Sequence, residues 1–176
     1  MIQSAFDLGE HLKLREVTFK VSPILWEKWD ITEFDLNFNN WTKIKFLNDN
    51  LDDFHNDISL VPNDKGGLYL FYVNCKTISG ITEIPFYIGR AQITDGQNLR
   101  KRVREYFNKF SKNNERPKIT RMFNYWKKDL YLAFYELDNN LDIIDLEKKL
   151  INSLLLPMND EIPDMETREA IKAFNL

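Results

Sequence analysis

Residues 67–75 read GLYLFYVNC and residues 84–89 read IPFYIG, and these two runs decide the fold. Both are rich in aromatic and β-branched residues and carry a glycine at one end, which is typical of β-strands. The polar stretch 76–83, with Ser79-Gly80, predicts a turn that joins them into a hairpin with a long loop. YLAFYEL at residues 131–137 predicts a third strand, buried because its apolar content is nearly continuous.

Helical spacing follows the hairpin. In NLRKRVREYFNKF (98–110), Leu99, Val103, Phe107 and Phe110 recur every three or four residues, which predicts an amphipathic helix. Further helices are expected at 119–128, 141–155 and 165–174. From Gly67 the expected order is β-β-α-α-β-α. We therefore predict an α+β layered fold, with a small, mainly antiparallel three-stranded sheet flanked by helices.

The first 60 residues form a unit of different character. Partial two-residue alternation over 12–21 predicts a strand, Pro23 opens a short helix, and 48–53 is a turn. This unit contains no constellation of chemically reactive residues, so its aromatic residues are expected to serve packing. We predict an N-terminal accessory segment, 1–60, packed on a core domain, 61–176, that ends in a short helix.

Composition excludes several classes of protein. The 176 residues are 43% hydrophobic and 29% charged, which is typical of a globular domain and not of a disordered chain. Cys75 is the single cysteine, so neither an intrachain disulfide nor a thiolate zinc cluster can form. No apolar stretch approaches the length of a membrane-spanning helix, and the N-terminus lacks the pattern of a signal peptide. We expect a soluble cytoplasmic protein without a membrane partner.

Charge is distributed unevenly along the chain. The net charge is only -3, but residues 61–129 hold 14 Lys/Arg against 6 Asp/Glu. The flanking segments are acidic, with 6 against 11 in residues 1–60 and 4 against 10 in residues 130–176. A local basic field, more than net charge, steers a polyanion. This central segment therefore favours a nucleic-acid partner, although a solvated helix face would give the same pattern.

Several short elements occur in an order that resembles the GIY-YIG nuclease superfamily. The resemblance covers about residues 67–160. It departs from the family in having Leu68 where isoleucine is usual and in a long interval between the two tyrosine tripeptides. The elements are Gly67-Leu68-Tyr69, Tyr87-Ile88-Gly89, a helix carrying Arg102, a helix carrying Glu147, and the later Asn159.

The resemblance implies a set of site residues. Its catalytic positions fall on Tyr69, Tyr87, Arg102, Tyr106, Glu147 and Asn159. It also implies that Glu147 binds Mg²⁺, for which Mn²⁺ can substitute, and a carboxylate is the hard oxygen ligand that Mg²⁺ prefers. An arginine stabilises phosphate oxygens because its planar donors stay ionised. The implied function is a metal-dependent endonuclease that hydrolyses phosphodiester bonds of DNA.

The water that attacks phosphorus needs a general base. Both histidines, His11 and His55, lie upstream of the motifs, so we expect a tyrosine with a depressed pKa in this role. Tyr69 is the first choice and Tyr87 its hydrogen-bonding neighbour, with the assignment between them left open. Basic residues on or near the first two core helices are expected to contact nucleic-acid phosphates. These are Arg90, Arg100, Lys101, Arg104, Lys118 and Arg121.

Two other functions fit parts of the sequence. Glu147-Lys148-Lys149 contains the E-x-K end of the PD-(D/E)xK nuclease signature, but that chemistry needs both residues on one face of a strand. The helical spacing of residues 141–155 disfavours it. The second alternative is a catalytically inactive GIY-YIG-like module that binds nucleic acid or protein. The presence of all the expected catalytic residue types disfavours that alternative.

Overall fold

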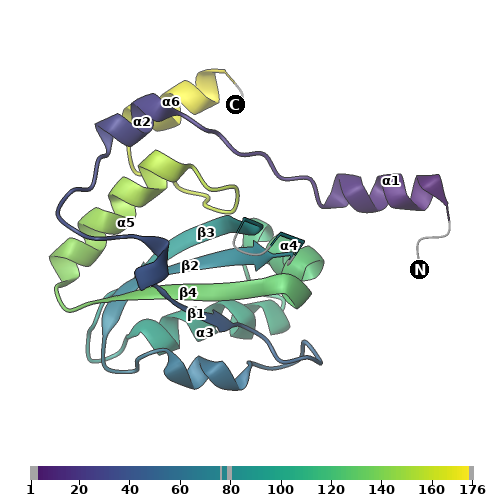
Figure 1. Ribbon diagram of the computed structural model, residues 1–176, viewed down its shortest axis with the longest axis horizontal. Coiled ribbons are helices and arrows are strands. Elements are labelled where there is room, and N and C mark those ends of the chain that lie inside the picture. Colours follow the sequence, from purple (N-terminus) through teal and green to yellow (C-terminus); the bar gives the residue numbers. More distant parts are fainter. Residues whose placement is uncertain (1–3, 76, 79–80, 175–176) are drawn as a thin grey trace.

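A computed structural model of the protein describes residues 4–75, 77–78 and 81–174. Its centre is a four-stranded sheet in the order β1-β4-β2-β3, in which each neighbouring pair is antiparallel (Figure 1). Since β2 and β4 are the inner strands, the longest apolar runs of the sequence occupy the middle of the sheet. The strands are β1 (Thr42–Lys45), β2 (Gly66–Asn74), β3 (Glu83–Ala91) and β4 (Leu130–Leu137).

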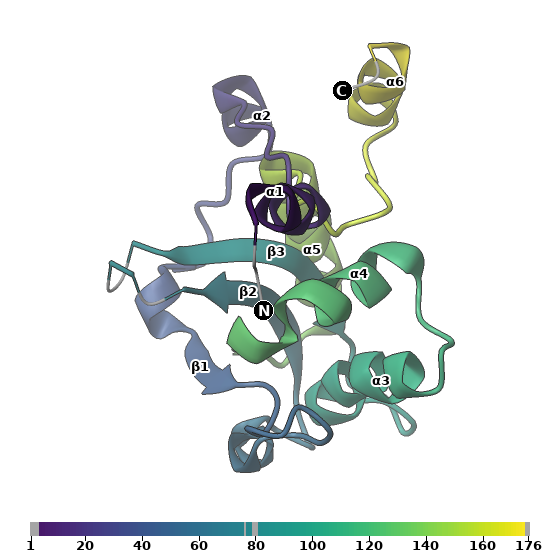
Figure 2. The same ribbon diagram turned by 90° about the vertical axis from the view of Figure 1, so that its right-hand side faces the viewer.

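Helices cover both faces of the sheet. Helices α3 (Leu99–Ser111) and α4 (Pro117–Trp126) lie on one face, and α5 (Asn140–Leu154) lies on the other (Figures 1 and 2). Side chains of a strand alternate between the two faces. Accordingly, Tyr69 and Phe71 of β2 pack with the α3 and α4 side chains, and Leu68, Leu70 and Tyr72 pack on the α5 side.

A bulge in β3 changes the direction of one side chain. Phe71 pairs with Tyr87 and Tyr72 pairs with Pro85, so Phe86 is an extra residue in the register. A bulge shifts the alternation of the strand that carries it by one residue. As a result, Phe86 and Tyr87 both belong to the core cluster on the α3 and α4 face. With strict alternation, two adjacent residues such as Phe86 and Tyr87 would instead point to opposite faces.

The two ends of the chain lie outside these layers. Helix α1 (Ala5–Leu14) has no buried residue and stands apart from the sheet (Figure 1). Helix α2 (Pro23–Lys28) lies beside α6 (Met165–Ala173), and Lys28 forms ion pairs with Asp164 and Glu166. Short 3₁₀ helices connect the rest: η1 (Phe38–Asn40), η2 (Asn56–Leu60) and η3 (Lys127–Asp129).

The predicted α+β class and the order β-β-α-α-β-α are confirmed. The predicted count of three strands is wrong, because residues 42–45 form a fourth strand at the edge beside β4. Residues expected in the accessory segment thus contribute β1 to the sheet, and Phe46 and Leu47 to the core. The division into 1–60 and 61–176 stays a prediction. The expected turn at Ser79-Gly80 lies outside the described residues.

The predicted strand over 12–21 is also wrong. Residues up to Leu14 belong to helix α1, which begins where the Ser4 side chain accepts a hydrogen bond from the Asp7 N–H. Such a cap satisfies one of the free N–H groups of the first turn. Residues 16–22 run without regular structure, since no strand lies beside them to pair with.

Among the described residues, no helix has the length and apolar character that crossing a membrane requires. The cytoplasmic location stays a prediction.

Candidate active site

A polar cavity of about 490 Å³ lies beside edge strand β3. Residues from several separate parts of the chain line it: β2, β3, the loop between β3 and α3, α3, the start of α4, α5 and the segment after α5. Residues far apart in sequence therefore share one space. The lining residues with polar or charged side chains include Tyr69, Tyr87, Arg90, Arg102, Arg116, Glu147, Asn159, Asp160 and Glu161. We call this the site cavity.

Three tyrosine hydroxyls form a chain at the base of the site cavity. The Tyr106 hydroxyl lies 2.7 Å from the Tyr69 hydroxyl and 2.9 Å from the Tyr87 hydroxyl. All three rings are buried, with exposures of 0%, 6% and 3% for Tyr69, Tyr87 and Tyr106. Tyr106 does not line the cavity, so it links the two phenols that do. A fixed hydrogen-bond chain of this kind holds each hydroxyl in one orientation.

A side chain at either tripeptide glycine, Gly67 or Gly89, would clash with neighbouring atoms. A Cβ on Gly89 would lie 2.6 Å from the Tyr69 hydroxyl oxygen and 2.7 Å from its Cζ atom. Tyr69 is paired with Gly89 across the β2–β3 ladder, so its phenol ring lies directly over this residue. Gly67 has a φ of +149°, and a Cβ there would meet the Tyr135 carbonyl oxygen at 2.1 Å. The glycines thus let β2 and its tyrosine approach their neighbours closely.

Arg102 is held in place from its own helix. Its Nη1 donates to Glu105 Oε2 at 2.7 Å, and Gln97 Nε2 donates to Glu105 Oε1 at 2.7 Å. The guanidinium also lies 5.4 Å from the centre of the Tyr106 ring. The side chain is 34% exposed, so part of its donor array faces the cavity. An ionised planar group in this setting can bind an anionic oxygen.

Arg116, one of the basic residues beside the first two core helices that favour phosphate contacts, lines the site cavity and contacts Tyr87. Its Nη2 donates to the Tyr87 hydroxyl at 3.4 Å, and its guanidinium lies 5.6 Å from the centre of the Tyr87 ring. Asp160 Oδ2 lies 3.4 Å from Arg116 Nη1. In the sequence it stands directly before Pro117, at the start of α4. A contact across 29 residues cannot be inferred from that position.

Glu147 brings a carboxylate to the cavity from the helix on the opposite face of the sheet. Its Oε2 atom forms an ion pair with Arg90 Nη1, and the Glu147 side chain is 16% exposed. Burial raises the pKa of Glu147 even though Arg90 and Arg102 favour the ionised form. Arg90, expected among the nucleic-acid contacts, thus lies inside the site cavity beside the predicted metal ligand.

Asn159 fastens the segment after α5 to the edge of β3. Its Oδ1 accepts from the Ile88 N–H at 3.1 Å, and its Nδ2 donates to the Ile88 carbonyl at 2.8 Å. The Met158 N–H donates to the Phe86 carbonyl at 3.0 Å. Helix α5 ends at Leu155, whose left-handed conformation turns the chain towards this edge. Asn159 therefore positions one wall of the cavity through the main chain of β3.

The prediction that the pKa of Tyr69 is depressed is wrong for the protein without bound substrate or metal. Burial raises the pKa of the Tyr69 phenol, and the nearby charge of Arg102 only partly offsets this effect. Burial also raises the pKa of Tyr106. The arginines near the site favour a lower tyrosine pKa, but the sequence alone does not show how completely the Tyr69 and Tyr106 rings are removed from water. In a dry setting the neutral phenol is favoured.

The other expected nucleic-acid contacts do not form one surface. Arg100, Lys101 and Arg104 line a separate hollow near the start of α3. The Arg100 guanidinium donates to the Val61 and Ser59 carbonyls, at 2.6 and 2.7 Å. Lys118 and Arg121 lie on α4 and line a second hollow beside the site cavity. The structure thus brings the six expected catalytic residues together but divides the six basic ones among three places.

The arrangement of α5 removes the basis of the PD-(D/E)xK alternative. Residues 140–154 are helical, so Glu147 and Lys149 do not lie on a common strand face. Lys149 instead forms an ion pair with Asp145 at 3.0 Å, whereas Glu147 pairs with Arg90. The two side chains that this chemistry would need together are engaged separately.

Comparison with known proteins yields no relative: no family model, no curated protein and no solved structure matches the chain.

Proposed function

We propose that this protein is a metal-dependent endonuclease that hydrolyses phosphodiester bonds of DNA, as its resemblance to the GIY-YIG nucleases implies. The observation that carries the proposal is the common cavity of two phenols, one guanidinium and one carboxylate. Tyr69, Tyr87, Arg102 and Glu147 are spread over 79 residues but line a single space. A cavity that gathers separated polar groups of this kind is the usual setting of an active site.

The arginines account for binding of the phosphate. A phosphodiester is anionic, and the transition state of its hydrolysis concentrates further charge on the phosphate oxygens. Arg102 and Arg116 line the cavity beside Tyr69 and Tyr87 and can each present two donors to these oxygens. Because both are held by carboxylates, Glu105 and Asp160, they need little reorganisation when the substrate binds.

Glu147 is the residue that would hold the metal. Within the described ranges there is no group of three or more His, Cys, Asp or Glu residues arranged to hold a metal ion. This fits Mg²⁺, which commonly takes one or two protein carboxylates and completes its shell with water and substrate phosphate oxygens. Held there, a metal ion would supply positive charge beside the scissile phosphate. Glu147 is paired with Arg90, so its carboxylate would have to be shared between that guanidinium and the ion.

In the proposed reaction a water oxygen bonds to phosphorus while the bond to the 3′-oxygen breaks. The proton of the attacking water passes to the ionised tyrosine base, and the leaving 3′-oxygen takes a proton from a solvent water, so that the products are a 5′-phosphate and a 3′-hydroxyl. Tyr69 is our first choice for the base because its hydroxyl reaches the cavity and bonds to Tyr106. The raised pKa of its phenol means that ionisation depends on the cationic groups of the loaded site, so activity should rise towards alkaline pH.

Purified protein incubated with plasmid DNA, single-stranded DNA and RNA, in Mg²⁺, Mn²⁺ or EDTA, tests the proposal directly. We expect metal-dependent cutting of DNA that falls about 10²- to 10³-fold or more in Arg102→Ala and Glu147→Ala. Asn108→Ala and Asp145→Asn are controls on the same two helices, since both residues are exposed and lie outside the site cavity.

Two results would contradict the proposal. Equal cutting by the parent and both site variants would assign the activity to another site or to a contaminant. Metal-independent binding without cutting, under every condition of the panel, would instead support a nucleic-acid-binding module that keeps the site geometry.

A further inference from the structure

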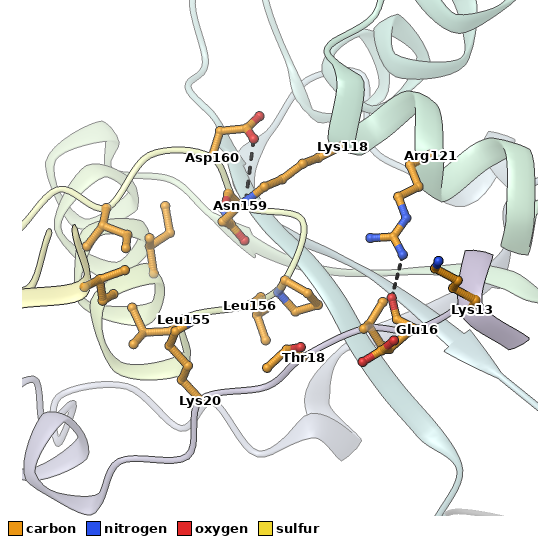
Figure 3. Close-up of a pocket in the computed structure, with 15 residues that line it drawn as sticks. Lys13, Glu16, Thr18, Lys20, Lys118, Arg121, Leu155, Leu156, Asn159 and Asp160 are labelled. Carbon is orange, nitrogen blue, oxygen red and sulfur yellow. Dashed lines mark hydrogen bonds and ion pairs between the residues drawn. The ribbon is translucent and has the colours of Figure 1, made fainter. Parts of the chain in front are cut away.

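The second hollow beside the site cavity is built partly from the N-terminal segment. We call residues 4–22 the arm, and this hollow of about 580 Å³ the arm cavity. The arm passes along one side of the hollow, and Lys118 and Arg121 reach in from α4 (Figure 3). Residues 155–160, which follow α5, form a further wall. The arm, to which the sequence analysis assigned no chemistry, is therefore part of a polar surface.

Arg121 fixes the arm to the body of the protein. Its Nη2 atom donates to the main-chain carbonyl of Glu16 at 2.5 Å (Figure 3) and to that of Leu14 at 3.2 Å. Val17 packs against the hydrophobic core. These contacts hold the residues between α1 and α2 against α4. Lys13 and Lys20, which lie on either side of the attached residues 14 and 16, are therefore both held at the wall of the arm cavity.

Positive charge predominates in the arm cavity. Four cationic side chains line it, Lys13, Lys20, Lys118 and Arg121, against two acidic ones, Glu16 and Asp160. Asp160 is already shared between Arg116 and Lys118, at 3.4 and 3.7 Å. The cations come from two segments far apart in sequence, the arm and α4, which is unlike a solvated face on one helix. Such a surface attracts a polyanion.

The arm cavity adjoins the site cavity. Ile151, Asn159 and Asp160 line both. A nucleic-acid chain carries a phosphate on every nucleotide, so the phosphates next to the one being cut must lie close to the site. The arm cavity offers cations on this side of the site. Lysines contact phosphates as point charges and do not read sequence.

We infer that the arm cavity binds the phosphodiester backbone of the nucleic-acid substrate next to the bond that is cut, through Lys13, Lys20 and Lys118. The inference rests on the proposed function for the identity of the bound chain. It assigns the N-terminal arm a role in substrate binding that is independent of the chemistry at Tyr69 and Glu147.

Binding measured in EDTA, where no cutting is expected, separates the two proposals. Fluorescence anisotropy with a labelled DNA duplex, over a range of salt concentrations, gives the affinity and its salt slope. For Lys13→Ala/Lys20→Ala we expect affinity to fall about tenfold and the salt slope to decrease by about 2. The matched control is Lys65→Ala/Lys172→Ala, which removes the same charge from two exposed lysines outside both cavities.

A conservative variant guards against loss of structure. Lys13→Arg/Lys20→Arg keeps the charges and should keep most of the parent affinity, while circular dichroism confirms that each variant is folded. Affinity and salt slope equal to the control in Lys13→Ala/Lys20→Ala would overturn the arm-cavity inference, even if the parent cuts DNA in Mg²⁺. Lysine-dependent binding by a parent that never cuts would support the arm cavity and contradict the endonuclease.

Discussion

The two faces of strand β2 use the same residue type in different ways. Tyr69 and Tyr72 lie three residues apart, on opposite faces, and are 0% and 2% exposed. The Tyr69 hydroxyl bonds to Tyr106 and reaches the site cavity. The Tyr72 ring instead packs against the rings of Phe38 and Tyr131, with centroids 5.6 Å apart in each case, and it does not line that cavity.

The comparison shows which properties mark a functional residue in this fold. Burial raises the pKa of both phenols, so neither burial nor the direction of the pKa change distinguishes them. The neighbours do: Tyr69 has a hydroxyl partner and an arginine, whereas the ring contacts of Tyr72 are with other aromatic rings. Tyr69 is a candidate for chemistry because its hydroxyl has a polar partner and its side chain lines the site cavity.

The largest expected difference in cutting rate is between two variants that each remove one tyrosine hydroxyl, one on each face of β2. Tyr69→Phe should lower the rate of DNA cutting by about 10²- to 10⁴-fold, because general-base catalysis is worth that much. Tyr72→Phe should leave the rate within about twofold, because that hydroxyl is remote from the cavity. Single-turnover cleavage with saturating protein measures both rates. Equal losses in the two variants would erase the distinction between the faces.

A smaller effect is expected from the glycine beneath the Tyr69 ring. Gly89→Ala places a methyl group within 2.7 Å of two Tyr69 atoms, so we expect it to lower the free energy of unfolding by about 1–3 kcal/mol. Cutting should fall as well, because the phenol is displaced. Gly96→Ala is the matched control, since a Cβ there has no atom within 4 Å. Urea unfolding compares the two, and similar stability in both would mean that Tyr69 is not held by this contact.

The smallest effect concerns Glu147, on the helix that covers the other face. Burial raises the pKa of the Glu147 carboxyl group above its ordinary value of 4.5. The folded protein therefore keeps this carboxyl group protonated at pH values where the unfolded chain has already released the proton. The contribution of Glu147 to stability is therefore fully present below the pKa of the unfolded chain. It declines as pH rises through the raised pKa of the folded protein. Glu147→Gln removes this titration.

Unfolding measured in EDTA from pH 4 to pH 7 tests this expectation. The variant should gain stability relative to the parent as pH rises across the interval. Asp145→Asn, an exposed neighbour on α5 that pairs with Lys149, serves as the control. A relative stability of Glu147→Gln that falls with increasing pH would show that attraction to Arg90 outweighs burial.

The strands and helices around the site could be predicted from sequence because their side chains alternate between core and solvent in regular patterns. Strand β1 could not, since Ile44 is the one buried side chain among its four residues and two lysines lie in it. Short, charged edge strands carry a weak pattern. The end of helix α1 was predicted as part of a strand. None of the residues of α1 is buried, so its apolar side chains do not follow the helical spacing that a buried face imposes.

The candidate site was predicted in its residue types but not in its interactions. The tripeptides and the helix patterns suffice to select Tyr69, Tyr87, Arg102 and Glu147. They give no access to the Arg116–Tyr87 contact or to the Arg90–Glu147 ion pair, which join residues 29 and 57 positions apart. The pKa of Tyr69 was predicted in the wrong direction for the same reason: burial is a property of the assembled fold.

The attachment of the arm has a consequence for how this chain can change. Arg121 grips carbonyl oxygens of residues 14 and 16, and every amino acid carries that group. These two hydrogen bonds therefore do not depend on which side chains positions 14 and 16 carry. Substitutions at these two positions should leave the attachment to α4 intact, whereas Val17 also packs against the hydrophobic core and is constrained by that contact.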